Sequence, residues 1–146
     1  LIENGVLQQF VQSSYSGRRN GTASTGNAVR GGFRGTPGCG CLAIQVVPGN
    51  RAPADIIAGI DDGVLIQSVQ GLHSGVNSVS GDFSTGASGL MIRNGQVAEP
   101  VREFTIASTL QRMLLDLAEF GNDIDYLPMR AVGVTAVVHD VTMSGA

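Results

Sequence analysis

The chain has 146 residues, of which 42% are hydrophobic and 14% charged, and it carries nine arginines, no lysine and a net charge of −3. This length suits one domain with its own core, and so low a charge content is not that of a disordered chain. The acidic balance argues against nucleic acid as a partner, because binding to phosphates needs a basic face.

The sequence also indicates a compartment. No apolar run approaches the roughly 18–20 residues of a membrane span and no signal-peptide pattern is seen, so we expect no membrane partner. Cys39 and Cys41 are separated by one residue. A disulfide between such near neighbours is strained, which favours free thiols in a reducing environment. We therefore expect a cytoplasmic protein.

The first half of the chain is predicted to hold a few short elements. The sequence begins with Leu1 instead of an initiator Met, and Asn4-Gly5 predicts a tight hairpin turn only three residues later. Only the last residues of the first hairpin strand are therefore present, and we expect a fragment whose N-terminal region is missing. The predicted elements are a strand at 6–11, one helical turn within 13–21, a long loop at 20–41, a strand at 42–47, a short helix at 53–60 and a strand at 64–69.

The second half is predicted to be mostly strand. Its predicted elements are a glycine-rich strand ending at Ile92, a turn at Asn94-Gly95, a strand at 96–106 with a bulge or edge position at Pro100, a loop at 122–129 and a last strand at 131–143. Between the strand at 96–106 and the loop at 122–129, a helix capped by Ser108 or Thr109 is predicted. Its core residues are expected to be Leu110, Met113, Leu114 and Leu117, and it is expected to end at Gly121.

These elements together predict a strand-dominated α+β fold. We expect a single domain over residues 1–146, in which two short helices cover a mixed or antiparallel sheet or an open barrel.

The glycine- and serine-rich segment 75–89 is the most informative stretch. Glycine inside a strand usually marks a bulge, or a place that another backbone or a ligand approaches closely. We expect this segment to offer a sheet edge to an extended peptide, or to let a partner domain come close. Asp82 is its most suggestive carboxylate. It either orients a substrate or partner, or it forms an Asx-type turn that holds a bulge together.

Other clusters have two interpretations each. Cys39 and Cys41, completed by His73 and His139, are a candidate metal site, but zinc ligands are usually spaced more widely, which favours plain thiols. Arg18-Arg19 is either a clamp for a carboxylate or phosphate or a solvated helical turn.

The polar segment Asn122-Asp-Ile-Asp125 is either a hard-cation loop or a loop that caps the preceding helix. It lacks the ligand spacing and the glutamate of a calcium loop, which favours the cap.

A series of short segments runs in a distinctive order along nearly the whole chain. They are Tyr15-Ser-Gly-Arg18 with Gly21, Ser24-Thr-Gly-Asn-Ala28, Gly75-Val-Asn77, Val79-Ser-Gly-Asp-Phe-Ser84, Gly86-Ala-Ser-Gly89, Ile92-Arg-Asn-Gly95, Pro100-Val-Arg102, Thr105-Ile-Ala107, Gly121-Asn-Asp123 and Val141-Thr-Met-Ser-Gly145. This series resembles the C-terminal domain of the PmbA/TldD family, long labelled modulators of DNA gyrase. The chain departs from the family pattern at Gly17, Asn20 and Ser78.

The resemblance implies a subunit of a two-subunit cytoplasmic protease that acts on extended or unfolded peptides. In the TldD-like catalytic subunit, zinc would be held by two histidines of an upstream His-Glu-x-x-x-His motif and by a cysteine after the Gly-Asn-Asp segment. Residues 122–146 of this chain contain no cysteine. The resemblance therefore implies a TldE/PmbA-like, non-catalytic subunit without its own metal, with zinc in the catalytic partner, in a homo- or heterodimer with a TldD-like subunit.

We expect this domain to help form a peptide-binding chamber and a dimer interface, with no catalytic or metal-binding residue of its own. The residues expected to bind peptide or form the interface are Arg18, Asn77, Ser80, Gly81, Asp82, Phe83, Ser84 and Gly86. Two alternatives stay open. One is an active zinc metalloprotease with an atypical ligand such as His139, and the other is a non-proteolytic, β-rich binding module.

Overall fold

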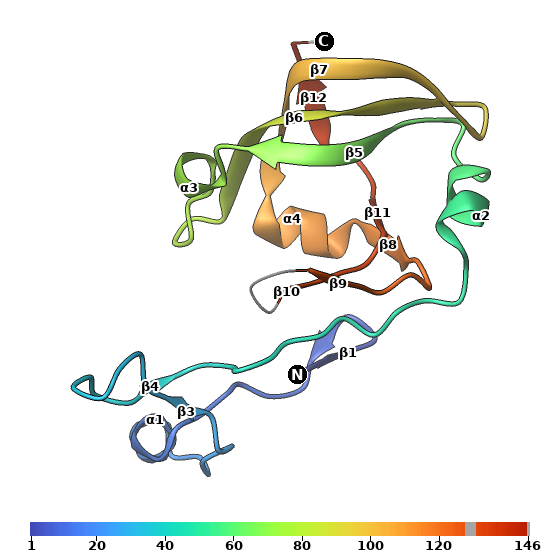
Figure 1. Ribbon diagram of the computed structural model, residues 1–146. Coiled ribbons are helices and arrows are strands. Elements are labelled where there is room, and N and C mark those ends of the chain that lie inside the picture. Colours follow the sequence, from blue (N-terminus) through green and yellow to red (C-terminus); the bar gives the residue numbers. More distant parts are fainter. Residues whose placement is uncertain (128–130, 146) are drawn as a thin grey trace. The chain divides into compact units, whose positions relative to one another are not determined.

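The computed structural model describes residues 1–127 and 131–145 (Figure 1). The chain divides into two compact units, Leu1–Gln45 and Val46–Ala146, and each is described by itself. This division leaves the single domain over 1–146 a prediction. All strand pairs in the described residues are antiparallel and no barrel closes, which confirms a strand-dominated α+β fold. The same residues form four short helices, where two were expected.

The first unit is built from local turns. β1 (Ile2–Glu3) and β2 (Val6–Leu7) form the predicted hairpin, with Asn4 and Gly5 at φ of 50° and 75°. Left-handed φ at both central residues is what a tight hairpin turn requires. Of the strand expected at 6–11, only Val6 and Leu7 pair with β1. A second small pair joins β3 (Ala28–Val29) to β4 (Gly38–Cys39).

Helix α1 (Ser14–Asn20) forms where one helical turn was predicted. The backbone N–H of Ser16 donates to the Ser13 hydroxyl, and the backbone N–H of Ser13 donates to the Ser16 hydroxyl, so the two residues form a capping box. Gly21, at φ 67°, ends the helix in the left-handed conformation.

The strand predicted at 42–47 is absent, and these residues have no regular structure. Leu42 and Val47 are 77% and 82% exposed. The β-branched composition of this segment predicted a strand, but a strand needs a neighbour to pair with, and none lies beside it in the described part of the chain.

The second unit centres on a four-stranded sheet in the order β12-β7-β6-β5. Its strands are β5 (Asp62–Gln70), β6 (Asp82–Arg93), β7 (Gln96–Thr109) and β12 (Thr142–Ser144). The predicted turn at Asn94-Gly95 joins β6 to β7, with φ of 48° and 77°. Phe104, Ala87 and Ile92 are buried on this sheet, and Ile56 of α2 (Pro53–Ile57) is the other buried apolar residue among those that the structure describes.

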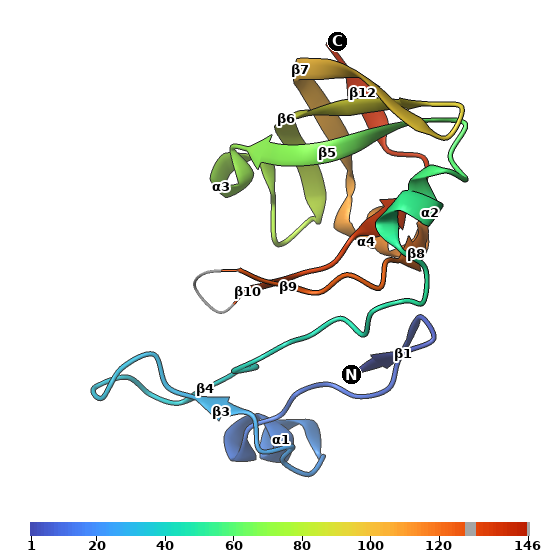
Figure 2. The same ribbon diagram turned by 45° about the vertical axis from the view of Figure 1, so that its right-hand side comes forward.

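Shorter elements complete the second unit. Helix α3 (Leu72–Gly75) follows β5, and α4 (Leu110–Leu115) follows β7 on one side of the sheet (Figures 1 and 2). β8 (Leu117–Phe120) pairs with β11 (Ala136–Val138), and β9 (Asp125–Leu127) pairs with β10 (Ala131–Gly133). No helix in residues 1–127 or 131–145 has the length and hydropathy to cross a bilayer.

Four C-terminal predictions were wrong in detail. Helix α4 is capped by Thr109 as predicted, but it ends at Leu115, so Gly121 does not end it. Leu110 and Leu114, both expected in the core, are 37% and 67% exposed, and no residue of α4 is buried, because a helix of six residues presents little surface to the sheet. The single strand expected at 131–143 is divided into β10, β11 and β12. Asp140, at φ 56°, lies between the last two. The loop expected at 122–129 contains β9, and its residues 128 and 129 lie outside the described residues.

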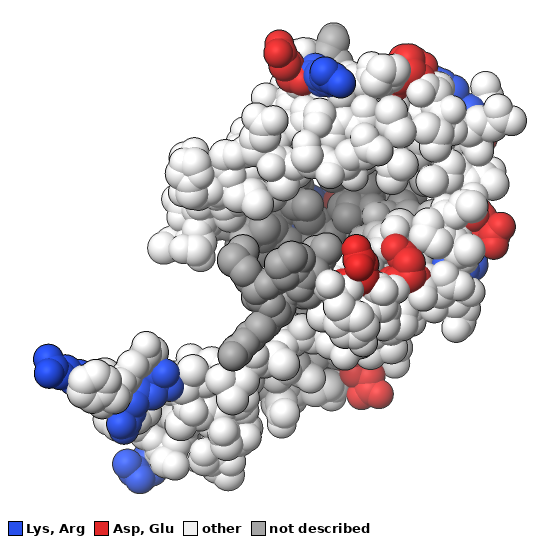
Figure 3. Space-filling model, viewed as in Figure 1, with Lys and Arg blue, Asp and Glu red and all other residues white. Residues whose placement is uncertain are grey.

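Charge is divided unevenly between the two units (Figure 3). The first unit holds Arg18, Arg19, Arg30 and Arg34, with Glu3 as its single acidic residue. The second unit carries the other eleven Asp and Glu residues against five arginines. The negative net charge of the chain is thus a property of the unit that contains the large sheet.

Candidate functional site

The expectation that segment 75–89 offers a free sheet edge is wrong. β6 is a central strand, paired with β5 from Gly86 to Arg93 and with β7 along its length. Beyond the end of β5, a bridge between Val76 and Phe83 covers the same edge, and the N–H of Asn77 donates to the carbonyl of Asp82 at 2.9 Å. An extended peptide therefore has no place to add as a strand beside β6.

The glycines of β6 do allow a close approach, but the approaching backbone belongs to β5. A Cβ at Gly89 would collide with the carbonyl of Leu65. A Cβ at Gly86, in contrast, would meet Gln70 only at van der Waals distance, 3.9 Å. Gly89 is thus needed for sheet packing, whereas Gly86 leaves open space on the surface of the sheet.

Segment 77–81 forms a closed loop before β6. The Asn77 side-chain oxygen accepts hydrogen bonds from the N–H groups of Val79 (2.9 Å) and Ser80 (3.2 Å), which is an Asx-type turn. The Ser80 hydroxyl donates to the Asp82 carboxylate at 2.7 Å. Asp82 therefore contributes to the loop as an acceptor, and the Asx turn is centred on Asn77. This hydrogen-bonding role does not exclude a contact with a partner, because the Asp82 carboxylate is exposed.

Gln111, which the sequence analysis missed, ties this loop to α4. Its amide donates to the carbonyl of Ser80 at 3.2 Å, and the N–H of Leu110 donates to the carbonyl of Gly81 at 2.7 Å. Gly81 adopts φ 85°, and a Cβ there would collide with the Gln111 side chain. A polar residue two positions after the helix cap Thr109 was the only sequence signal for this contact.

The structure brings seven of the eight predicted site residues together and leaves one apart. Asn77, Ser80, Gly81 and Asp82 form the loop described above, Ser84 and Gly86 follow on the exposed face of β6, and Phe83 is half-buried between them. Arg18 lies in the first unit, exposed in the last turn of α1. There it lines a separate hollow of about 530 Å³ with Tyr15 and Pro37.

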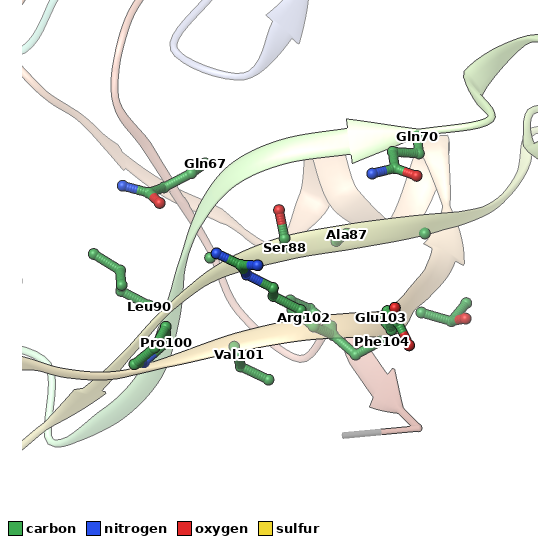
Figure 4. Close-up of a pocket in the computed structure, with 13 residues that line it drawn as sticks. Gln67, Gln70, Ala87, Ser88, Leu90, Pro100, Val101, Arg102, Glu103 and Phe104 are labelled. Atoms are coloured by element: carbon green, nitrogen blue, oxygen red, sulfur yellow. The ribbon is translucent and has the colours of Figure 1, made fainter.

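The exposed face of the large sheet is hollowed into a groove of about 650 Å³ (Figure 4). Alternate residues of β6 face outward, so Gly86 and Ser88 line the groove while Thr85 is buried. The groove residues are Gln67 and Gln70 of β5, residues 86–90 of β6 and residues 100–105 of β7. This groove, which we call the sheet groove, is mainly polar in its side chains, with Leu90 and Pro100 at one end (Figure 4).

Two β-bulges converge on Ser88. On one side, Ile66 pairs with Gly89 and Ser68 with Ser88, so Gln67 is an extra residue in β5. On the other side, Ala87 pairs with Phe104 and Gly89 with Val101, so Arg102 and Glu103 together oppose Ser88. Bulges re-aim side chains and are frequent next to functional sites. Here they place polar side chains from three strands around one small residue.

Glu103 adopts a backbone conformation that is unusual for its residue type, with φ 57°. Non-glycine residues at left-handed φ cost energy and often occur where a site needs a particular side-chain direction. The predicted irregularity at Pro100 is also present: β6 and β7 change register between Leu90 and Ile92, next to the Leu90–Pro100 pair.

Arg102 differs from the other described arginines of the second unit. Arg51, Arg93 and Arg112 each form an ion pair with a carboxylate. Arg102 forms none within residues 1–127 and 131–145. Its side chain runs from β7 toward Ser88 in the sheet groove (Figure 4).

The Gly-Asn-Asp segment has a structural role. The Asp123 carboxylate accepts a hydrogen bond from the Thr135 hydroxyl at 2.8 Å and two from the Thr135 N–H, each at 3.2 Å. Asp123 thus holds the loop after β8 to the segment before β11, and does not cap α4 as the sequence suggested. The Thr135 hydroxyl lowers the pKa of Asp123 below its ordinary value.

Replacing Thr135 with Val is expected to raise the pKa of Asp123 toward the ordinary carboxyl value, because the donating hydroxyl is lost. Since the folded-state pKa is lowered, the contact stabilises the fold above the ordinary carboxyl pKa, and this stabilisation is lost as pH falls through the lowered value. An NMR titration of the Asp123 carboxyl carbon measures the shift, with Thr142→Val as control. An unchanged pKa would show that the hydroxyl is not the cause.

The residues expected to bind metal in one interpretation do not form a zinc site. Zinc takes three or four His, Cys, Asp or Glu ligands. No group of three such side chains gathers within residues 1–127 and 131–145. The Cys39 thiol lies 2.9 Å from the carbonyl of Val11, and Cys39 and Cys41 are free. His139 contacts Asp116 through its backbone N–H. The described residues therefore hold no complete zinc site.

Comparison with known proteins identifies the family. The family model described as PmbA/TldA metallopeptidase C-terminal domain matches residues 1–145. The chain belongs to the PmbA/TldD family. It is 37% identical over 126 residues to a metalloprotease PmbA homolog of Haemophilus influenzae, a match that covers 86% of this chain and 26% of that protein. The PmbA/TldD domain described above thus spans about a quarter of that relative.

Two further relatives carry the names TldE and TldD. The structure of TldE from Thermococcus kodakarensis superimposes with a TM-score of 0.84 at 31% identity, over 99% of this chain and 33% of that one. A protein of Saccharolobus solfataricus named zinc metalloprotease TldD homolog is 28% identical over 126 residues, covering 83% of this chain and 28% of that protein. The family thus includes proteins named for zinc, PmbA and TldE.

Proposed function

We propose that this domain belongs to a TldE/PmbA-like, non-catalytic subunit of a cytoplasmic peptide-processing protease, and that it forms part of the peptide-binding chamber and of the dimer interface. The sheet groove carries the proposal. It is an open, polar hollow of about 650 Å³ on the four-stranded sheet, a size that suits a short stretch of peptide.

The groove replaces the sheet edge as the place where a peptide binds. Because both edges of β6 are paired, main-chain recognition by strand addition is not available there. Side chains of Gln67, Gln70 and Ser88 instead offer amide and hydroxyl groups that can donate to and accept from a peptide backbone. Asp82, Ser84 and the loop at 77–81 are proposed to contact the partner subunit, since they extend the same strand beyond the groove.

Catalysis is proposed to come from a TldD-like partner that holds zinc. One observation supports this. Residues 122–146 contain no cysteine to serve as a third ligand. Arg18 is proposed as an interface residue of the first unit, where it lies exposed beside Tyr15 in a hollow of its own.

Filling the sheet groove is expected to abolish peptide binding. Gly86→Trp places an indole in the groove, and the backbone accepts a Cβ at this position because its nearest neighbour is Gln70, 3.9 Å away. We expect at least a tenfold loss of affinity for a labelled, extended peptide in the complete protein, measured by fluorescence anisotropy. The matched control is Gly31→Trp in the first unit, where a Cβ meets nothing within 4 Å. Equal peptide binding by the wild type and Gly86→Trp would show that the groove is not the peptide site.

A second experiment tests the assembly. The complete protein is purified from its own cells, and its stable partner is identified by mass spectrometry. A partner that carries His-Glu-x-x-x-His supports the proposal, and zinc held stoichiometrically by this protein alone contradicts it.

A further inference from the structure

The sheet groove contains an arginine with no acidic partner in the described residues, and this singles out one ligand chemistry. We propose that Arg102 binds a carboxylate of the peptide, so that the groove selects peptides by a negative charge at one position. The inference rests on the proposed function, because it assigns a ligand group within the same groove.

Arg102 is available to bind a ligand. An arginine on an acidic surface usually finds a carboxylate, as Arg93 does with Asp62 and Glu99 on the same sheet. The second unit has eleven acidic residues, yet no described carboxylate lies within ion-pair distance of Arg102. Its planar guanidinium is left to bind a carboxylate through two parallel hydrogen bonds.

Polar groups lie around Arg102 in the groove. The Ser88 and Ser68 hydroxyl oxygens lie 2.7 Å apart, so one hydroxyl donates to the other and the second keeps its proton for a ligand. The amide of Gln67, re-aimed by the bulge in β5, adds N–H donors to the same groove. Figure 4 shows Arg102 running toward Ser88, away from Glu103. This cluster offers donors to an anion.

The negative charge of the second unit limits which anionic ligands can bind. The excess of acidic residues on this unit repels a polyanion such as a nucleic acid, whereas one carboxylate held by a short-range bidentate contact meets much less repulsion. Leu90 and Pro100 supply apolar surface next to Arg102 at one end of the groove. The carboxylate is therefore either the C-terminal α-carboxylate of a peptide or the side chain of an Asp or Glu, with apolar atoms beside it.

Glu103 also lines the groove and bears on the charge selectivity. Its carboxylate repels a second negative charge, so the groove accepts one carboxylate in the Arg102 half and disfavours another near Glu103. Glu103→Gln is therefore expected to strengthen the binding of a carboxylate peptide by about twofold to threefold, in keeping with a partly screened, exposed charge.

The test uses the complete protein and three hexapeptides of Ala and Leu with rhodamine at the N-terminus. One ends in a free carboxylate, one in an amide, and one in an amide with an internal Glu. We expect the wild type to bind at least one of the two acidic peptides about tenfold more tightly than the neutral one. The stronger of the two identifies the source of the carboxylate.

Arg102→Gln is expected to remove this preference, so that acidic and neutral peptides bind with equal affinity, and Arg102→Lys is expected to keep only part of it because lysine lacks the planar fork. Arg93→Gln, on the same sheet but already paired with Asp62, is the control and is expected to keep the full preference. Retention of the preference in Arg102→Gln overturns the inference.

The two proposals fail in different ways. If neither acidic nor neutral peptides bind the wild type, the proposed function fails and the inference fails with it. If all three peptides bind equally and Gly86→Trp abolishes their binding, the groove is a peptide site and only the role of Arg102 is overturned.

Discussion

Replacing Phe104 with Ala is expected to lower the local free energy of unfolding of the large sheet by about 3–5 kcal/mol. Phe104 is 1% exposed and pairs with Ala87 across β6 and β7. Removal of this buried aromatic ring leaves a cavity that neighbouring side chains fill only in part. Hydrogen exchange of the β6 and β7 amides in the complete protein, followed by mass spectrometry, measures the loss.

The same substitution at an exposed site is the control for Phe104. Phe33, in the first unit, is 83% exposed, so Phe33→Ala is expected to change stability by no more than about 0.5 kcal/mol. Equal losses in the two variants would show that Phe104 is not the centre of the core. Phe104 also follows the Arg102–Glu103 bulge directly, so its loss is expected to weaken carboxylate selectivity together with stability.

Replacing Gly89 with Ala is expected to destabilise the sheet by about 1–3 kcal/mol through overpacking. The added methyl group would collide with the Leu65 carbonyl, and relief requires β5 and β6 to move apart. Because this strain falls beside the bulge at Gln67, the geometry of the sheet groove is expected to change with it. Hydrogen exchange of the β5 amides gives the magnitude.

Gly86→Ala on the same strand provides a matched comparison. There the methyl group meets Gln70 at an ordinary contact distance of 3.9 Å, and fewer unfolded conformations remain accessible to alanine. We expect this variant to be neutral or more stable by up to about 1 kcal/mol. If both substitutions destabilise β6 equally, glycine is required along the whole strand for a reason other than the approach of Leu65.

The sequence predicted the positions of turns and helix starts more reliably than the pairing of strands. The hairpin turns at Asn4-Gly5 and Asn94-Gly95 and the helix cap at Thr109 were all confirmed, because each depends on the φ preference or side chain of one or two adjacent residues. The strand at 42–47 and the long helix ending at Gly121 were wrong. Both depended on whether distant residues supply a neighbour to pair or pack with.

In the candidate site, too, the local features were predicted and the strand pairing was not. Segment 75–89 was selected for its glycines, and β6 does lie at the centre of the large sheet with Gly86 in the groove. The expected sheet edge was wrong, because β5 and β7 occupy both sides of β6. The sequence did not predict Gln67, Ser88 and Arg102 as site residues, because they lie on three strands. Nothing in their sequence spacing shows that bulges turn them toward one groove.

By itself, the sequence determined the family, the strand-rich composition and the local turns, since these depend on residue types and on residues close together in the chain. Only the tertiary structure decided that β6 is central, that Gly89 serves the approach of β5, and that Arg102 has no described carboxylate partner. The physical reason is that strand register joins residues far apart in the chain. A bulge of one residue changes which side chains share a face, and the local sequence carries little signal of where that occurs.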